Sequence, residues 1–385
     1  GVFSARDEQT NLIVPGAEGS SGALFDLANV SSVGRYRLDF GSNSTVGATV
    51  TDRRGSGYAN SVISADTVYR ITDADLVKAS FARSRTTYDD SMVDTLGTPT
   101  GPIHDDAITL EYNHGVREWW VNARYEDFGD DYRSDLGFRP GVGFRSLWTG
   151  AARIWWGEDD APWFRKAWGG AVVRSEFQDG SKLEELAQTW ANARGPRESQ
   201  IAGTFEIGQR VHDGIEFDVW TLEAGAFVQA TADAAFALDV TWGDWIDFAQ
   251  SRPAKRLFVK PSFRYTAGQH LYIHFSHIAS RLDVDGGRLF QVHAPELRLI
   301  QQFNTRVFLR LVLQYTAIER DPSLYTEPVD ADTQDLFTQV LFTYKINPQT
   351  AMYVGYSDNR FGDDEFSLTR TDRTLFLKLG YAFVR

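Results

Sequence analysis

An alternation of apolar and polar side chains in steps of two is the feature that most constrains this chain. In residues 305–318, TRVFLRLVLQYTAI, two arginines and a glutamine interrupt a run that otherwise reads as a buried strand. Successive side chains of a strand point to opposite faces, whereas a helix would spread the arginines around its circumference. The segment therefore predicts a strand with one apolar face and one wet face. The apolar face carries Val307, Leu309, Leu311, Leu313, Tyr315 and Ala317, and the wet face carries Arg306, Arg310, Gln314 and Thr316, with Phe308 and Val312 as exceptions.

The same alternation recurs along the whole chain. It predicts roughly 20 strands and no amphipathic helix. Short turns alternate with longer polar links, and an even number of strands places both chain ends on the short-turn side. The alternation is clearest in residues 33–40, 117–126, 255–265, 270–277 and 375–383. The longer links are expected at 10–31, 53–60, 86–105, 129–140, 251–256, 321–332 and 359–371.

Two all-β architectures accommodate such strands. A soluble sandwich or propeller buries the apolar face, whereas a transmembrane barrel turns it toward lipid. The strands run about 10–14 residues, longer than the usual ~5–6 residues of soluble sheets, and short turns alternate with long loops. Tryptophans gather near strand ends, as in the interfacial girdle of membrane barrels. The girdle candidates are Trp155, Trp156, Trp163, Trp242 and Trp245.

These observations favour a transmembrane antiparallel up-and-down β-barrel formed by residues 1–385 as a single domain. We expect about 20 strands, short periplasmic turns and long extracellular loops, in the outer membrane of a Gram-negative bacterium. The partners implied are the lipid bilayer and lipopolysaccharide. The chain begins with Gly and a strand-like stretch, so we expect that a signal peptide or an N-terminal domain has been removed upstream.

In this architecture the charged side chains of the wet face line an aqueous lumen. On the lipid face an arginine at mid-depth would cost roughly 2–4 kcal/mol. Walls of mixed sign bias the charge of a permeant solute, and they also form ladders of cross-strand ion pairs that stiffen a wide barrel. The predicted lumen-lining residues are Arg35, Arg37, Asp39, Glu118, Arg124, Arg264, Arg306 and Arg310.

Composition excludes several classes of protein. The net charge of -13 argues against a nucleic-acid partner. The chain has no Cys, so disulfides and Cys-ligated metals are excluded. Eighteen consecutive apolar residues occur nowhere, so the sequence contains no candidate transmembrane helix.

The loop 129–140 carries both charges and apolar side chains. It is a candidate constriction that folds inward and narrows the lumen, and the alternative is a packed surface loop. The residues of this candidate are Asp130, Asp131, Arg133, Asp135 and Phe138.

Ligand spacing predicts no cofactor and no defined metal site. His270 and His274 share a strand face about 13 Å apart, too far for one ion, and His277 points the other way. The acidic loops 87–94, 129–135 and 358–366 could bind Ca²⁺, although none has the EF-hand spacing. Solvated outer loops bridged by divalent ions to lipopolysaccharide are the alternative.

No nucleophile motif is present: the chain lacks G-x-S-x-G and shows no Ser/His/Asp arrangement. The sequence therefore does not predict an enzyme, although a lipid- or glycan-processing barrel enzyme remains a third hypothesis. Such an enzyme would need polar residues that converge on the lumen wall or rim.

Five stretches resemble a known family. The chain is similar to the outer-membrane β-barrel domain of unknown function that follows a family 9-like carbohydrate-binding module in Gram-negative bacterial proteins. The resemblance implies a barrel over the whole chain and supplies no catalytic residues, because the chemistry of the family is not established. The stretches that carry it are residues 33–53, 131–140, 303–315, 341–358 and 375–383.

The sequence leaves two main functions open. The first is a channel that transports polar solutes, saccharides among them, through a charged lumen. The second is a structural anchor or scaffold barrel that holds a periplasmic or surface partner protein. About 20 strands enclose a lumen wider than side chains can fill, so the lumen holds water, folded-in loops or another polypeptide.

Overall fold

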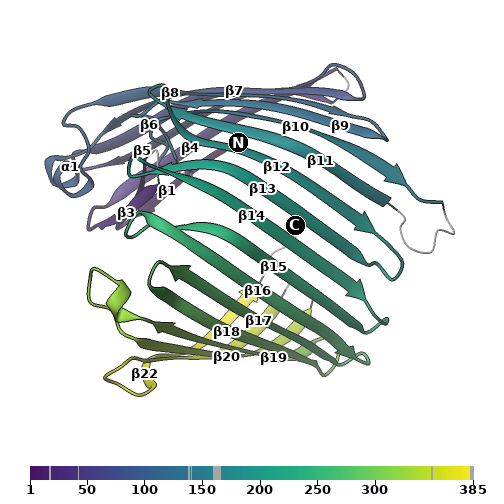
Figure 1. Ribbon diagram of the computed structural model, residues 1–385. Coiled ribbons are helices and arrows are strands. Elements are labelled where there is room, and N and C mark those ends of the chain that lie inside the picture. The colour runs from purple at the N-terminus through teal and green to yellow at the C-terminus, as the bar shows by residue number, and fades with distance from the viewer. Residues whose placement is uncertain are drawn as a thin grey trace. The chain divides into compact units, whose positions relative to one another are not determined.

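The computed structural model describes residues 1–16, 19–41, 43–137, 139, 141–158, 166–347 and 350–381. Twenty strands form one antiparallel sheet, and β2 and β3 form a separate hairpin (Figure 1). The predicted all-β class with about 20 antiparallel strands is confirmed. One short helix, α1 (Asp90–Leu96), and one 3₁₀ turn, η1 (Pro322–Leu324), were not predicted.

The strands of the sheet are long. Most have 12 to 16 residues, as in β4 and β16, which agrees with the lengths expected from the sequence. The strands of the first part of the chain are β1 (Val2–Asp7), β2 (Thr10–Pro15), β3 (Ser20–Phe25), β4 (Asn29–Phe40), β5 (Ser44–Gly55), β6 (Tyr58–Arg70), β7 (Asp75–Thr87), β8 (Ile103–Gly115), β9 (Trp119–Phe128), β10 (Phe144–Trp156) and β11 (Lys166–Gln178). The second part contains β12 (Ser181–Arg194), β13 (Gln200–His212), β14 (Ile215–Gln229), β15 (Ala234–Asp247), β16 (Arg252–Ala267), β17 (Leu271–Val284), β18 (Gly287–Gln302), β19 (Val307–Arg320), β20 (Asp332–Asn347), β21 (Thr350–Gly362) and β22 (Thr369–Tyr381).

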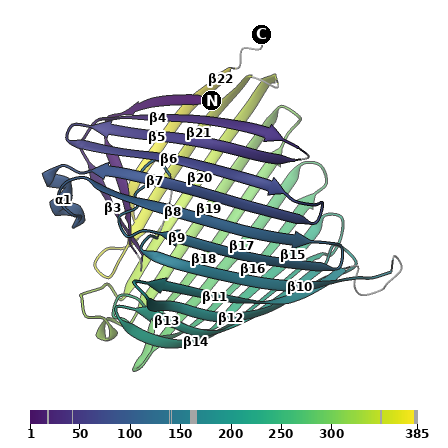
Figure 2. The same cartoon turned by 90° about the horizontal axis from the view of Figure 1, so that it is seen from above.

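Strands that follow each other in the chain pair with each other. This holds from β4 to β10 and from β14 to β22, and β1 pairs with β4. Figure 2 shows β4 to β9 side by side in chain order. Within the described ranges, no helix is both long and apolar enough to cross a membrane.

The chain divides into two compact units. Unit 1 contains Gly1–Ile154, Gly169–Thr189 and Gly208–Asp218, and unit 2 contains Trp155–Trp168, Trp190–Ile207 and Val219–Arg385. Unit 1 therefore holds β1 to β9 and the helix, and unit 2 holds β15 to β22.

Two of the long links predicted from the sequence are wrong. Strands β5 and β6 are joined by the two residues Ser56 and Gly57, and β16 already begins at Arg252. Gly57 has φ +71, a conformation that tight hairpin turns require and that glycine adopts without strain. Polar residues of the second range, which we predicted to form a loop, belong to β16 instead. One of them, Lys255, forms a 2.8 Å ion pair with Asp244 of β15.

The sheet of unit 1 has two chemically distinct faces. One face, here called the apolar face, leaves large apolar side chains exposed, among them Tyr36 at 70%, Ile63 at 59% and Leu110 at 49%. The opposite face is here called the polar face. It carries Arg35, which neighbours Tyr36 in the chain, and Glu111, which neighbours Leu110. Exposed aliphatic side chains in this number are unusual for a face in contact with water.

The apolar face of β7 and β8 is framed by two polar pairs. Asp75 pairs in register with His114 near the short turns, and Arg83 pairs with Asp106 near the long loops. Arg83 and Asp106 form an ion pair with an N–O distance of 2.8 Å, and His114 Nδ1 lies 2.8 Å from Asp75 Oδ1. Between them, residues 75 to 83 and 106 to 114 span eight positions each, about 26 Å of strand. With a strand tilt of about 40°, this gives a belt roughly 20 Å tall, close to the lipid-facing band of membrane barrels.

The next two strands repeat this spacing. On the apolar face of β9 the belt runs from Trp119 to Asp127, and on β10 it runs from Arg145 to Arg153. Asp127 and Arg145 pair in register and form a 3.1 Å ion pair, and the Arg153 guanidinium lies 4.6 Å from the Trp119 ring. The belt is therefore a continuous property of four strands.

Unit 2 follows the same parity. Leu311 of β19 pairs with Leu299 and Val340, so apolar side chains of three strands share a face. Arg310 lies on the opposite face, where its Nη2 donates a 2.8 Å hydrogen bond to Gln339. The alternation read from residues 305–318 thus describes the observed strand.

Candidate functional site: the polar face of unit 1

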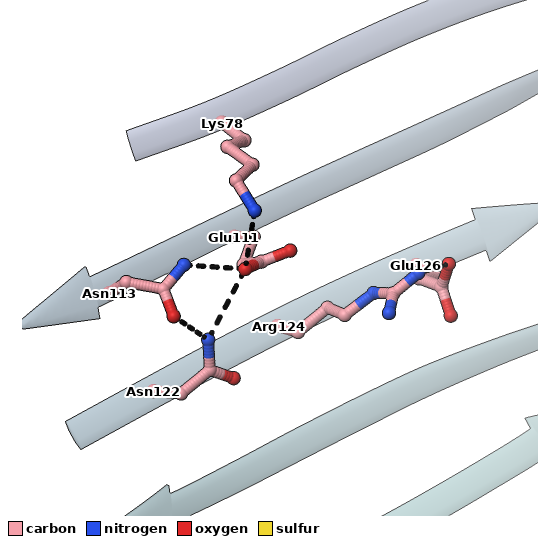
Figure 3. A network of polar contacts seen from close by, with 6 residues as sticks. All are labelled: Lys78, Glu111, Asn113, Asn122, Arg124 and Glu126. Atoms are coloured by element: carbon pink, nitrogen blue, oxygen red, sulfur yellow. Dashed lines mark hydrogen bonds and ion pairs between the residues drawn. The ribbon is translucent and has the colours of Figure 1, made fainter. Parts of the chain in front are cut away.

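A network of polar side chains crosses β7, β8 and β9 on the polar face (Figure 3). Lys78 Nζ lies 3.2 Å from Glu111 Oε1, and the same carboxylate accepts hydrogen bonds from the amides of Asn113 and Asn122. Asn122 also donates to Asn113 Oδ1 at 2.6 Å. One carboxylate therefore gathers donors from three adjacent strands.

Arg124 continues this network along β9. Its guanidinium lies 2.7 Å from Glu126, which also lies 3.8 Å from the guanidinium of Arg139. Arg139 stacks over Phe128 with 3.5 Å from its central carbon to the ring centroid, and burial lowers its pKa. The network thus ends against a loop that covers part of the polar face.

A second ion pair bridges two strands that are not neighbours. Arg35 of β4 binds the Asp66 carboxylate of β6 through two hydrogen bonds of 2.8 and 3.0 Å, passing over β5. A Cβ at Gly47 of β5 would lie 2.9 Å from the arginine and 3.0 Å from the carboxylate. Glycine at this position provides the room for the bridge.

The cations of this wall are largely matched by anions. Arg35 pairs with Asp66, Arg37 pairs with Asp39, Lys78 pairs with Glu111, and Arg124 pairs with Glu126. A wall built this way presents many dipoles and hydrogen-bonding groups but little net charge.

Three segments cover the polar face at its long-loop end. We call them the inner cap, which comprises the described residues 10–16, 19–25, 88–102, 129–137, 139 and 141–143. Leu12 of the β2–β3 hairpin and Met92 of α1 are each 1% exposed and pack with Tyr58, Tyr88 and Ile103. Helix α1 is short but well capped, since Asp89 accepts a hydrogen bond from Met92 N and Gly97 adopts the left-handed conformation.

The hairpin of the inner cap is tied to the sheet by a buried arginine. Arg53 of β5 is 7% exposed, and it donates to Asn29 Oδ1 at 3.1 Å and to the carbonyl of Asn11 at 3.0 Å. The sequence placed residue 53 in a long polar link, so this contact was not foreseen.

The loop of the inner cap is held by the polar face itself. Arg133 N donates to Ser84 Oγ at 3.0 Å, and Asp131 N donates to Asp105 Oδ2 at 3.0 Å. Tyr58 donates to the Asp135 carboxylate at 2.6 Å, and burial raises the pKa of that carboxyl. The loop therefore folds onto the polar face.

The structure places each residue of the predicted constriction loop except one. Arg133 is 6% exposed, and Asp130 accepts a hydrogen bond from the Arg133 guanidinium through its carbonyl at 2.8 Å. Phe138 lies outside the described residues. The narrowing of a lumen by this loop stays a prediction.

The predicted lumen-lining residues divide into two groups. Most lie on the polar face of a strand, and Arg264 of unit 2 donates a 3.3 Å hydrogen bond to Gln229. Two do not belong to strands: Glu118 lies in the turn before β9, and Arg306 lies directly before β19. The ladder nevertheless continues to both, since the Glu118 carbonyl accepts from Ile154 N at 2.8 Å and the Arg306 carbonyl accepts from Lys345 N at 2.7 Å. Their position on a lumen wall stays a prediction. The residues on strands are Arg35, Arg37, Asp39, Arg124, Arg264 and Arg310.

The tryptophans predicted as one girdle lie on both faces. Trp242 is on the apolar face beside Trp220, with ring centroids 4.9 Å apart. Trp245, three positions later, packs with Ala254 and Leu289 on the opposite face. Trp155 and Trp156 are adjacent in β10 and so point to opposite faces, which corrects the prediction for Trp156 and Trp245. Trp163 lies outside the described residues.

Sequence reasoning missed several members of the site, namely Asp66, Lys78, Asn113 and Arg139. The period-two alternation would have placed the strand residues among them on the polar face. It could not have predicted which of these side chains contact each other. In the part of the chain that the structure describes, no three His, Cys, Asp or Glu side chains are grouped as a metal site.

Comparison with known proteins supports the fold. No family model matches the chain, and no curated protein matches it. Three solved structures resemble it over nearly its whole length. The siderophore receptor PirA from Acinetobacter baumannii has a TM-score of 0.56 and 10% identity, covering 100% of this chain and 74% of that chain. The copper transporter OprC has a TM-score of 0.59 and 8% identity, covering 99% and 75%.

The third structure is a mutant form of the ferric enterobactin receptor PfeA from Pseudomonas aeruginosa. It has a TM-score of 0.51 and 9% identity, and the alignment covers 99% of this chain and 80% of that chain. At these identities the likeness is one of fold. The chain shares the large antiparallel sheet of outer-membrane receptors and transporters.

Proposed function

We propose that the protein is a β-barrel of the Gram-negative outer membrane that transports polar solutes. The observation that carries the proposal is the belt on β7 to β10, where apolar side chains face one side for eight positions and paired charges face the other. A soluble sheet would bury the apolar face, yet Ile63, Leu110 and Leu147 are about half exposed. Lipid is the surrounding that suits such a face.

The proposed lipid surroundings also require the sheet to close into a barrel. A strand edge in lipid would leave backbone groups without partners, and a closed barrel removes every edge. The sheet therefore closes on itself. Because the chain contains no Cys, pairs of introduced cysteines, one in β22 and one in β1 or β4, would crosslink specifically in a closed barrel. Absence of crosslinking at every register would contradict closure.

The outer boundary of the belt fits a polar headgroup layer. The ion pairs Arg83–Asp106 and Arg145–Asp127 lie at the long-loop end of the apolar face, directly beyond the apolar rows. Charged groups at this level interact with the polar part of lipopolysaccharide, while the chains of the lipid contact the belt.

Passage of solute occurs along the polar face. The paired charges of the wall offer hydrogen-bonding groups without a dominant sign, which suits neutral or weakly charged polar solutes. The inner cap covers the long-loop end of the polar face of unit 1 and restricts the size of what passes.

Planar-bilayer recording tests the proposal. The purified protein should insert in discrete steps of equal conductance in KCl. Loosening the inner cap by Asn60→Ala should increase the unit conductance, whereas Asn304→Ala, in the turn before β19, should not. A protein that inserts and folds but never conducts would overturn the transport function.

A further inference from the structure

Two tryptophans of unit 1 lie on the polar face beside the charged network. Trp120 of β9 and Trp148 of β10 pack edge to face, with ring centroids 5.8 Å apart and planes at 65°. Both are partly exposed. Contact with lipid does not explain these indoles, because the lipid belt lies on the other face of the sheet.

The backbone makes room for one of these rings. A Cβ at Gly150 would lie 2.6 Å from Cγ2 of Val172 and 3.3 Å from Cη2 of Trp148, so the indole and the valine side chain both lie close to the glycine. Gly150 pairs in register with Asn122. The result is an aromatic surface lying low on the sheet, next to the amide of that asparagine.

Polar groups flank this surface on the neighbouring strand. Arg124 pairs in register with Trp148, and its guanidinium uses one Nη atom on Glu126. Asn122 and Asn113 are bound to each other and to Glu111. Hydrogen-bond donors and acceptors therefore lie close together beside the Trp148 ring, and the cations among them are paired with carboxylates.

We propose that this surface, Trp148 with Trp120, Asn122 and Arg124, binds a ring of a neutral saccharide. A pyranose has an apolar face of C–H groups that stacks on an aromatic ring, and an equatorial rim of hydroxyls that both donate and accept hydrogen bonds. An anion would meet Glu111 and Glu126, and a cation would meet Arg124 and Lys78, so a neutral ligand fits best. The inference names the substrate class of the proposed transport function and rests on it.

Binding can be measured without conductance. Isothermal calorimetry of the detergent-solubilised protein with maltohexaose and with cellohexaose should show binding of at least one of them. Trp148→Ala should weaken that binding by about tenfold or more, and Trp148→Phe should weaken it less. Gly150→Val should weaken it by displacing the Trp148 ring together with Val172. The matched control is Trp119→Ala, adjacent to Trp120 but on the apolar face, which should bind as the wild type does.

The outcomes separate this inference from the proposed function. If neither oligosaccharide binds the folded protein, or if Trp148→Phe and Gly150→Val both bind as tightly as the wild type, the saccharide site is wrong even in a conducting channel. If the sugar binds and its binding depends on Trp148 while the bilayer stays silent, the site stands and transport fails. Binding of an aromatic glycoside but not of its free sugar would also overturn the proposal.

Discussion

The side-chain amide of Asn60 donates a 3.1 Å hydrogen bond to the carbonyl of Arg133, 73 positions away in the chain. Its oxygen accepts from Asp135 N at 3.2 Å, and its nitrogen also donates to Thr86 at 2.8 Å. Asn60 is fully buried. One amide on β6 therefore holds the backbone of the inner-cap loop at two points.

Removing this amide should release the loop. Asn60→Ala leaves the Arg133 carbonyl and the Asp135 N–H without their partner, at a cost of about 1–3 kcal/mol. Hydrogen exchange followed by mass spectrometry should show faster exchange in peptides covering residues 129–137. The control is Asn113→Ala on the uncovered wall, which should leave these peptides unchanged. Unaltered protection in Asn60→Ala would show that the cap is held elsewhere.

The two faces of β8 can be told apart with neighbouring residues. Leu110→Arg puts a charge in the belt and should destabilise the folded protein in lipid by roughly 2–4 kcal/mol. Thr109→Arg puts the same charge on the polar face opposite Glu126 and should be nearly neutral. Urea unfolding in lipid vesicles measures both. Equal destabilisation by the two arginines would contradict the assignment of the faces.

The Arg35–Asp66 pair should set the charge preference of the channel more than its stability. Both side chains are partly exposed, at 45% and 31%, so water screens the pair. Arg35→Ala should shift selectivity toward cations and Asp66→Asn toward anions, and the double variant should return near the wild type. Reversal potentials in a KCl gradient give the measurement. If the pair lay away from the solute path, the reversal potentials of all three variants would equal that of the wild type.

Attachment of the inner-cap loop should weaken as the pH rises. Burial raises the pKa of Asp135 in the folded protein, so the protonated form is favoured there. The stabilising effect of that proton is fully present below the ordinary Asp pKa and is lost as the pH passes the raised value. Hydrogen exchange in residues 129–137, corrected for the intrinsic rate, should increase over that range.

The matched variants for this pH effect lie in the same loop. Asp135→Asn cannot ionise and should keep the loop protected at higher pH, whereas Asp131→Asn should keep the wild-type dependence. The pH effect would have another origin if it persisted unchanged in Asp135→Asn.

Strand β19 shows most clearly what could be predicted from the sequence. The parity of residues 305–318 was sufficient to place Leu311 and Arg310 on opposite faces, because side-chain direction in a strand depends only on position along it. The same rule assigned Arg35 and Arg124 correctly. It was applied too loosely to Trp155 and Trp156, since adjacent residues cannot share a face.

Boundaries were less predictable than faces. Residues 53–60 and 251–256 look like loops because they are polar, yet they belong to strands except for the turn residues Ser56 and Gly57 and for Ser251. Their charges lie beyond the belt, where Arg53 enters the inner cap and Lys255 pairs with Asp244. A polar stretch marks the end of the apolar belt, and the end of the strand lies farther along.

The sequence by itself determined the class of the fold, the two-faced strands and their approximate number, because these depend on local spacing alone. Only the tertiary structure decided that the β2–β3 hairpin, α1 and loop residues 129–137 fold onto the polar face, and that Arg35 reaches Asp66 over Gly47. Such contacts join residues 31 to 73 positions apart, and they form only where strand register and loop path bring matching groups together. A local sequence pattern does not predict these long-range contacts.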